Sequence, residues 1–170
     1  MSDVLIIMGS DSDLPVMKEA AIVLEELNIN YIVTIVSAHR TPKRMFEEAQ
    51  NAKSKGFKCI IAGAGGAAHL PGMTASLTEL PVIGVPIKTS TLSGIDSLYS
   101  IVQMPPGIPV ATMAIDGARN AGLFAAKIIA LSDENVAKRL TRLLKKLEET
   151  ILDKASKLED LGYEKYLLRK

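Results

Sequence analysis

The chain of 170 residues contains no tryptophan, three phenylalanines and four tyrosines, so aromatic residues make up only 4% of it. Its formal net charge is +1, from 20 basic and 19 acidic residues. Proteins that bind single-stranded nucleic acid stack bases on aromatic side chains, and duplexes or anionic membranes attract a strongly basic surface. Neither feature is present. We therefore expect a small-molecule ligand, and neither nucleic acid nor a membrane as partner.

Cysteine is nearly absent as well. Cys59, in "FKCII", is the only one, which excludes a disulfide within one chain and a zinc cluster built from cysteines. A free cysteine inside an apolar run behaves as a small hydrophobic residue. The sequence therefore predicts that Cys59 belongs to the core.

The sequence also lacks long apolar runs. No segment reaches the roughly 20 apolar residues that a membrane-spanning helix needs. The N-terminus "MSDVLIIMGS" has an acidic residue, Asp3, where a signal peptide carries positive charge, and its apolar run is short. We predict a cytoplasmic protein.

What the chain does have is a regular alternation of short apolar runs and helix-like segments. The apolar runs are continuous, as in strands that are covered on both faces. The alternation predicts an α/β fold, a three-layer doubly wound parallel sheet with strand order 2-1-3-4-5. Strands are expected at 4–8, 31–36, 58–62, 82–86 and 109–115, and helices at 14–27, 42–55, 70–79, 93–103 and 118–131.

The last part of the chain is charged and amphipathic, with apolar residues every three or four positions between Ser132 and Leu161. A helix of about 30 residues would be about 45 Å long and would extend beyond its own domain. This segment is a solvated helix, or two shorter helices, or a helix whose apolar stripe packs on another subunit. We favour packing on another subunit, because such a stripe needs cover. We divide the chain into a domain at 1–131 and a helical extension of it at 132–170.

Two of the three loops that follow the first three strands carry polar side chains at helix starts. In "GSDSD" (9–13), Ser10 and Ser12 offer hydroxyl groups, and Asp13 either accepts bonds from ligand hydroxyls or caps the helix that begins at "LP". Thr41 before Pro42 has the same capping pattern. Ligands of open parallel sheets bind at the carboxyl ends of the strands, where these loops converge, and free N–H groups at helix starts favour anions.

The second loop, "SAHRTP" (37–42), adds a titratable group and a fixed cation. Arg40 can bind phosphate or carboxylate with two parallel hydrogen bonds, and His39 can exchange a proton near neutral pH. Adjacent residues often point apart, so His39 can face a reacting centre while Arg40 holds a distant phosphate. A lone histidine more often has a structural role, but the position at a strand end beside arginine favours a functional one.

The third loop, "GAGGAAHLPGM" (63–73), is rich in glycine. Gly63, Gly65 and Ala68 match the dinucleotide pattern G-x-G-x-x-[GA], but the next strand ends in "VIGVP" without the acidic residue that binds ribose. No phosphate-binding G-x-x-x-x-G-K-[ST] motif occurs, and two histidines without a suitably spaced carboxylate make a poor zinc site. A bare backbone at Gly65 and Gly66 would let a planar substrate approach, with N–H groups directed at a carboxylate or carbon dioxide and His69 at the rim. Close packing of a helix on a strand would also explain the glycines.

Taken in order, "MGSDSD", "SAHRTP", "AGAGGAAHLPGM", "GVP", "LSGIDSLYSIVQMP" and "NAGLFAAKI" resemble the PurE family, over about residues 3–131. The loops are similar to those of its class I N5-carboxyaminoimidazole ribonucleotide mutases of purine biosynthesis. The resemblance implies a flavodoxin-like fold, a homo-octamer with active sites at subunit junctions, and no metal, ATP or organic cofactor. Pro106 departs from the family, whose members often carry Gly or Arg there, which affects the contacts of the 103–109 loop.

The resemblance also implies the residue roles. Ser10, Asp13 and Arg40, assisted by Ser12, would bind the ribose phosphate. His39 would be the general acid and base of carboxylate transfer from the exocyclic nitrogen to C4 of the aminoimidazole, and His69 would line the carboxylate pocket.

Three alternatives to this reaction remain open. Class II relatives use carbon dioxide with the uncarboxylated ribonucleotide. A non-catalytic phosphate-ligand binding protein would bind without turnover. A flavin-binding protein would be yellow, and the shortage of aromatic residues argues against it.

Overall fold

The computed structural model describes residues 3–169, and its centre is a five-stranded sheet in the order β2-β1-β3-β4-β5. All neighbouring strands are parallel. This confirms the predicted fold class and strand order. The strands are β1 (Val4–Met8), β2 (Tyr31–Ile35), β3 (Cys59–Gly65), β4 (Val82–Ile87) and β5 (Ala111–Thr112).

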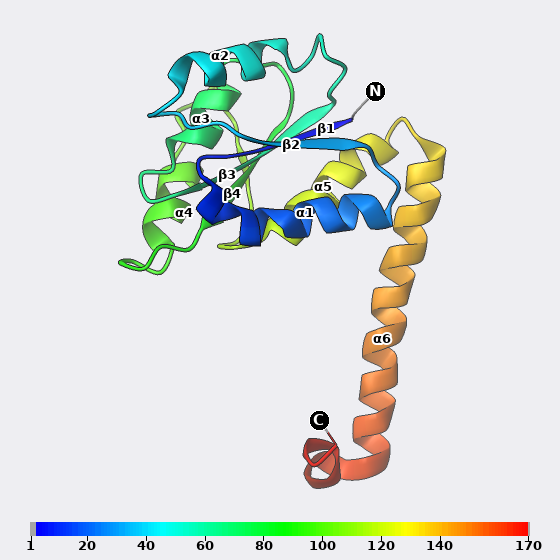
Figure 1. Ribbon diagram of the computed structural model, residues 1–170. Helices are drawn as coiled ribbons and strands as arrows, with labels where there is room; N and C mark the ends of the chain where they lie inside the picture. Colours follow the sequence, from blue (N-terminus) through cyan, green and yellow to red (C-terminus); the bar gives the residue numbers. More distant parts are fainter. Residues whose placement is uncertain (1–2, 170) are drawn as a thin grey trace.

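Helices cover both faces of the sheet and give the three layers (Figure 1). One face packs on α1 and α5, the other on α2, α3 and α4, and α6 follows α5. The helices are η1, a 3₁₀ turn (Asp11–Asp13), α1 (Leu14–Glu26), α2 (Pro42–Asn51), α3 (His69–Ala75), α4 (Ile95–Val102), α5 (Ala118–Ala130) and α6 (Glu134–Leu167).

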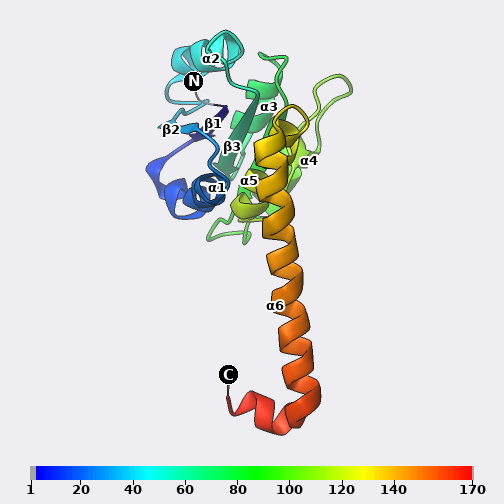
Figure 2. The ribbon, with the colours of Figure 1, turned by 90° about the vertical axis from the view of Figure 1, so that its right-hand side faces the viewer.

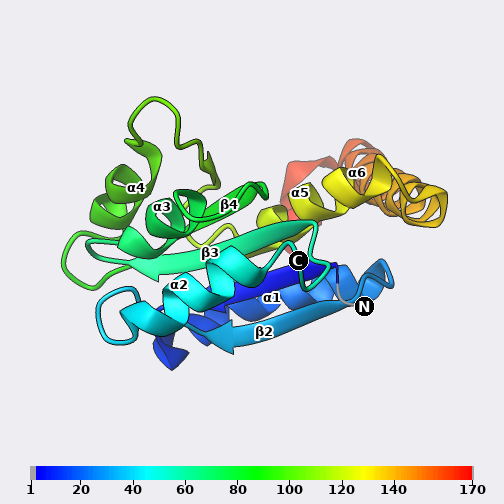
Figure 3. The same ribbon diagram turned by 90° about the horizontal axis from the view of Figure 1, so that it is seen from above.

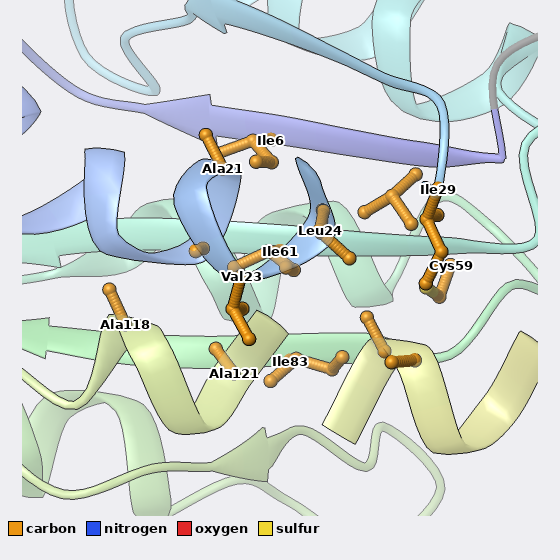
Figure 4. Close-up of a cluster of buried hydrophobic side chains, with 14 of the residues drawn as sticks. Ile6, Ala21, Val23, Leu24, Ile29, Cys59, Ile61, Ile83, Ala118 and Ala121 are labelled. Atoms are coloured by element: carbon orange, nitrogen blue, oxygen red, sulfur yellow. The ribbon is translucent and has the colours of Figure 1, made fainter. Parts of the chain in front are cut away.

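The two faces of each inner strand contribute to two separate apolar clusters. Along β1, Ile6 lies in the cluster under α1 and α5, while Leu5 and Ile7 lie in the cluster under α2 and α3, as the two-residue period of a strand requires. Figure 4 shows Cys59 in the first cluster among isoleucine, valine and alanine side chains. Its side chain is fully buried, which confirms the prediction for this residue.

The edges of the sheet differ from expectation. The run predicted at 31–36 is not covered on both faces, because β2 is an edge strand and Ile32 and Ile35 remain 47% and 48% exposed. The strand predicted at 109–115 shortens to two residues. Pro109 has no N–H for the ladder, and the chain turns away where Gly117 donates its N–H to the carbonyl of Ala114.

Helix α6 leaves the domain in both side views (Figures 1 and 2). It has 34 residues, and only Val136 and Leu140, near its start, are buried. It exceeds the predicted length, but Gly162 has φ 71° and ψ 158°, so the helix breaks there and a short last segment turns aside. The Asp133 side chain caps its start by accepting from the N–H groups of Asn135 and Val136.

Candidate active site

A cavity of about 650 Å³ lies at the carboxyl ends of the strands. The arrowheads of β2 and β3 point to this edge in Figure 3. The three predicted loops converge here, joined by the segment that follows β4. The lining residues are Gly9, Ser10, Ser12, Asp13, Ser37, Ala38, His39, Arg40, Ala64, Gly65, Gly66, Ala68, His69, Leu70, Ile87, Lys88, Thr89 and Ser90.

Both histidines of the chain meet in this cavity. His39, in the loop after β2, and His69, the first residue of α3, approach to 2.6 Å between Nε2 of His39 and Nδ1 of His69. Their ring planes are nearly perpendicular, at 79°, and their centroids are 4.8 Å apart. The contact joins loops from two strands that are not neighbours in the sheet, because β1 lies between β2 and β3.

Arg40 ties the first two loops together. Its guanidinium donates to the carbonyl of Gly9 at 2.8 Å and, through Nε, to the hydroxyl of Ser37 at 3.3 Å. The side chain of Ser37 also accepts the N–H of Arg40. The guanidinium is thereby held at the cavity rim, and only part of its donor set is used.

The "GSDSD" loop forms a compact turn. Asp13 is 8% exposed and accepts the N–H of Ser10, while Ser12 donates its hydroxyl to the Asp13 carboxylate at 3.3 Å. Burial raises the pKa of Asp13, and the bonds from Ser12, Ser10 and Gly9 and the charge of Arg40 oppose that rise.

Two predicted helix caps are wrong in detail. Asp13 stands at the N-cap of α1 without capping it, since its carboxylate turns back to Ser10. Thr41 likewise makes no cap and instead exchanges hydrogen bonds with Ser37.

A buried serine holds the glycine loop in place through a hydrogen bond. Gly66 has φ +69°, a conformation that favours glycine, and a Cβ there would meet nothing within 4 Å, so the space above it is open. Its N–H, expected from the sequence to face a carboxylate, donates instead to Ser97 Oγ at 2.9 Å. Ser97 is fully buried and donates to the carbonyl of Ile87 at 2.7 Å.

Sequence reasoning missed Ser97 and the fourth wall of the cavity, formed by Lys88, Thr89 and Ser90. The signal for that wall was available, because these residues follow a buried strand as the three identified loops do. Lys88 is the second cation of the cavity besides Arg40. Thr89 is fixed by a hydrogen bond to Asp96 at 2.9 Å.

Three further features were sought in residues 3–169: a cluster of metal ligands, a membrane-spanning helix and a reactive thiol. No group of three or more His, Cys, Asp or Glu side chains is close enough to hold a metal ion, and no helix in this range is long and apolar enough to cross a membrane. Burial raises the pKa of the Cys59 thiol to about 12, so this residue is unsuited to nucleophilic work at neutral pH.

Fold and cavity together define a doubly wound α/β protein of the flavodoxin-like type, with a polar, histidine-containing site at the carboxyl ends of its strands. Residues 3–150 match the AIR carboxylase family. The chain belongs to this family, which is the PurE family that the loop motifs indicated.

Its relatives include the N5-carboxyaminoimidazole ribonucleotide mutase of Thermotoga maritima, which is 61% identical over all of this chain and 99% of that protein. The protein of the same name from Pyrococcus horikoshii is 59% identical over 95% of this chain and 92% of its own length. The phosphoribosylaminoimidazole carboxylase of Saccharomyces cerevisiae is 58% identical over 97% of this chain, but that match covers only 29% of the yeast protein. The crystal structure of Treponema denticola PurE superimposes with a TM-score of 0.85 at 28% identity, covering 93% of this chain and 99% of that one.

Proposed function

We propose that the protein is an N5-carboxyaminoimidazole ribonucleotide mutase, which moves a carboxylate from the exocyclic nitrogen to C4 of the aminoimidazole ring in purine biosynthesis. One observation carries the proposal: two histidines from separate loops meet beside a bare glycine loop and a fixed arginine in one cavity. This set can exchange a proton, accommodate a planar ring and bind a phosphate.

The lengths of the relatives support the mutase over the carboxylase. The relatives named as mutases are matched over 92–99% of their length. The yeast protein named as a carboxylase is matched over less than a third, so most of that protein has no counterpart here.

The ribose phosphate would lie at the end of the cavity formed by the β1 and β2 loops. Arg40 supplies a fixed charge there, and Ser10 and Ser12 supply hydroxyl groups. The free N–H groups that the sequence predicts at this helix start are not available, because those of Ser12, Asp13 and Leu14 are bonded within the turn. Asp13 suits ribose hydroxyls better than phosphate, because a carboxylate repels a phosphate but accepts bonds from hydroxyl groups.

The carboxylate or released carbon dioxide would lie over Gly65 and Gly66, with His69 at the side. The open space above Gly66 supports this role. The Gly66 N–H is bonded to Ser97, so Gly66 contributes room rather than a donor. The next N–H, that of Ala67, has no partner within residues 3–169 and is exposed.

His39 would act as general acid and then as general base. Protonation of the carbamate nitrogen releases carbon dioxide, C4 attacks it, and removal of the C4 proton completes the transfer. Retention of carbon dioxide in a cavity of about 650 Å³ keeps it next to C4. We infer that no metal, ATP or organic cofactor takes part.

We further propose that the enzyme works in the cytoplasm as a homo-octamer, in which the catalytic domain at 1–131 is joined to its neighbours through the extension at 132–170. Two exposed apolar faces support assembly. One is on α4 and the loop before it, where Leu92, Ile95, Tyr99 and Val102 are 48–61% exposed at spacings of three and four. The other is the outer part of α6. Faces of this kind mark interaction surfaces.

The reaction is tested with N5-carboxyaminoimidazole ribonucleotide, without ATP, metal or bicarbonate, by following the ultraviolet absorbance of the C-carboxylated product. Rapid conversion that is lost in His39→Asn is expected. Turnover only of the uncarboxylated ribonucleotide with bicarbonate would make the protein a class II carboxylase. Binding of either ribonucleotide without turnover would make it a binding protein.

A further inference from the structure

The contact between the two histidines restricts where protons can lie. A hydrogen bond between Nε2 of His39 and Nδ1 of His69, 2.6 Å apart, needs one hydrogen between the two atoms. Neither ring makes another hydrogen bond within residues 3–169. The two outward nitrogens, Nδ1 of His39 and Nε2 of His69, are therefore the atoms that can meet a ligand.

A doubly protonated imidazole can only donate, so the charged ring must be the donor and the other ring must be neutral. If both rings were charged, two N–H groups would face each other and the contact would open. The pair can therefore hold one extra proton while it stays together. The ring that acts as the acid is the ring that carries that proton.

We propose that His69 is a positioning residue for His39, an inference that rests on the proposed function in taking His39 as the acid. His39 donates its Nε2–H to Nδ1 of His69, which leaves Nδ1 of His39 as the atom that gives and takes the proton. His69 carries its own hydrogen on Nε2, where it can donate to the carboxylate of the substrate.

The proton balance closes on this one atom. Nδ1–H of the His39 imidazolium protonates the exocyclic nitrogen, the nitrogen–carbon bond of the carbamate breaks with its electron pair left on nitrogen, and carbon dioxide leaves. C4 forms a bond to the carbon dioxide, and the C4 proton passes to Nδ1 of the now neutral His39. The imidazolium is restored, and the bond to His69 stays unchanged throughout.

The charge of the proposed substrate explains why a neutral imidazole, rather than the carboxylate that other enzymes use, orients His39. The charged groups that share the cavity are Asp13 on η1, Arg40 on the β2 loop and Lys88 after β4, and none of them hydrogen-bonds to either ring. A carboxylate in place of His69 would also orient His39, but it would repel a substrate that carries a carboxylate and a phosphate. A neutral imidazole orients without that repulsion and offers an N–H on its other side.

The protonation pattern is directly measurable, because the chain has two histidines and so four imidazole nitrogens. With ¹⁵N-histidine-labelled full-length protein, nitrogen NMR as a function of pH reports which nitrogens carry hydrogen, and the His69→Asn spectrum assigns the signals. In the neutral form we expect hydrogen on Nε2 of both rings, with one proton then added at His39 Nδ1 before His69 changes. Hydrogen on Nδ1 of His69, or two independent protonations, would overturn the proposal.

Three variants at position 69 separate positioning from general loss of a side chain. The amide oxygen of His69→Asn can replace Nδ1 as acceptor, whereas His69→Gln places its amide near Nε2 and His69→Ala provides neither. We expect kcat of the Gln and Ala variants to fall at least tenfold below that of the Asn variant, with a similar KM. In these two variants the alkaline fall of kcat should also move to lower pH, because the charged form of His39 loses its acceptor. Equal losses with unchanged pH profiles in all three would refute positioning.

Both histidines are exposed, so these variants should keep the wild-type thermal unfolding midpoint. The NMR measurement does not depend on turnover. If the wild-type protein fails to convert N5-carboxyaminoimidazole ribonucleotide, the proposed reaction is wrong while the tautomers can still be as stated. If turnover is present and the tautomers differ, only the positioning role fails.

Discussion

Helices α5 and α6 follow one another in the chain but use their apolar residues differently. Helix α5 has 13 residues and buries six small or aliphatic ones, and Gly122 lets it lie close against α1. Helix α6 has 34 residues and buries two, while Leu147, Ile151 and Leu158 are 46%, 62% and 42% exposed. Periodicity predicts a helix in both cases, but burial depends on whether the same chain supplies a partner. Helix α5 is covered within its own chain, whereas the outer part of α6 leaves its apolar residues exposed, which fits the proposed packing on another subunit.

In the proposed function the chemistry belongs to the cavity at the sheet and not to α6, and we expect Arg40→Ala to have the largest effect of the variants below. Loss of the fixed guanidinium would remove the charged hydrogen bonds that we propose it makes to the substrate phosphate, worth about 1.5–3 kcal/mol each, so we expect kcat/KM to fall about 100-fold. Oligomer size should stay unchanged. Steady-state kinetics and analytical ultracentrifugation provide both readouts.

The matched control is Arg44→Ala. Arg44 lies four residues further along the chain, in α2, and donates to the hydroxyl of Thr34 and the carbonyl of Ile35, outside the cavity lining. If both variants lose activity equally, the assignment of Arg40 to the phosphate is wrong.

Assembly should depend on α6. The double variant Leu147→Asp with Ile151→Asp places charges in the apolar stripe, where each buried side chain would contribute about 1.5–3 kcal/mol. We expect the assembly to dissociate into smaller species by mass photometry, with the fold of each chain retained by circular dichroism. Lys145→Asp makes the same total change of charge at an exposed position of the same helix, by reversing the charge of one side chain, and should leave the size unchanged. An intact assembly in the double variant would remove α6 from the interface.

The close approach of α5 to α1 should affect the stability of the fold and not the chemistry of the cavity. A Cβ at Gly122 would lie 2.9 Å from the carbonyl oxygen of Ala20, a backbone atom that cannot move aside easily. We expect Gly122→Ala to lower the free energy of unfolding by about 1–3 kcal/mol in urea denaturation, as overpacking does. Asn120→Ala, at an exposed position of the same helix, is the control and should change it little. A stable Gly122→Ala protein would mean that the two helices can separate at low cost.

The smallest expected effect concerns Asp13, whose carboxyl group is buried beside the cavity. Because its pKa is raised by burial, its contribution to stability is present below the unfolded pKa and lost as pH rises through the folded pKa. Asp13→Asn should therefore be more stable than wild type at pH 7 by up to about 1 kcal/mol, and equally stable below about pH 4. Denaturation at the two pH values checks the sign. A less stable variant at pH 7 would show that the charged carboxylate is needed for its bonds to Ser10 and Ser12.

The sequence predicts the inner part of the fold better than its edges. The buried strand β1 keeps its predicted limits of 4–8, because a continuous apolar run needs cover on both sides. The strand predicted at 58–62 instead spans Cys59–Gly65, because its pairing with β4 continues into the glycine loop. At the edges the same signal is ambiguous: β2 has the same apolar run with exposed faces, and Pro109 shortens β5. The helix starts at Leu14, Pro42 and Ala118 also match, because proline and turn residues mark them.

For the site, the rule that ligands bind at the carboxyl ends of strands brings the three loops together. It does not fix side-chain directions. The contact of His39 with His69 and the return of Asp13 to Ser10 depend on loop conformations that involve distant residues. The partner of the Gly66 N–H lies 31 positions further along the chain, where no local pattern points to it.

The hydrogen bonds of Ser97 connect two walls of the cavity. By bonding the Gly66 N–H at 2.9 Å and the Ile87 carbonyl at 2.7 Å, it joins the loops after β3 and β4. To separate them would leave buried polar groups unpaired, at about 1–3 kcal/mol each. The glycine loop is therefore fixed to the end of β4, directly before Lys88. On the opposite side the β1 and β2 loops are joined by an exposed hydrogen bond from the Arg40 side chain to the Gly9 carbonyl, so we expect a substrate that needs a wider entrance to obtain it there.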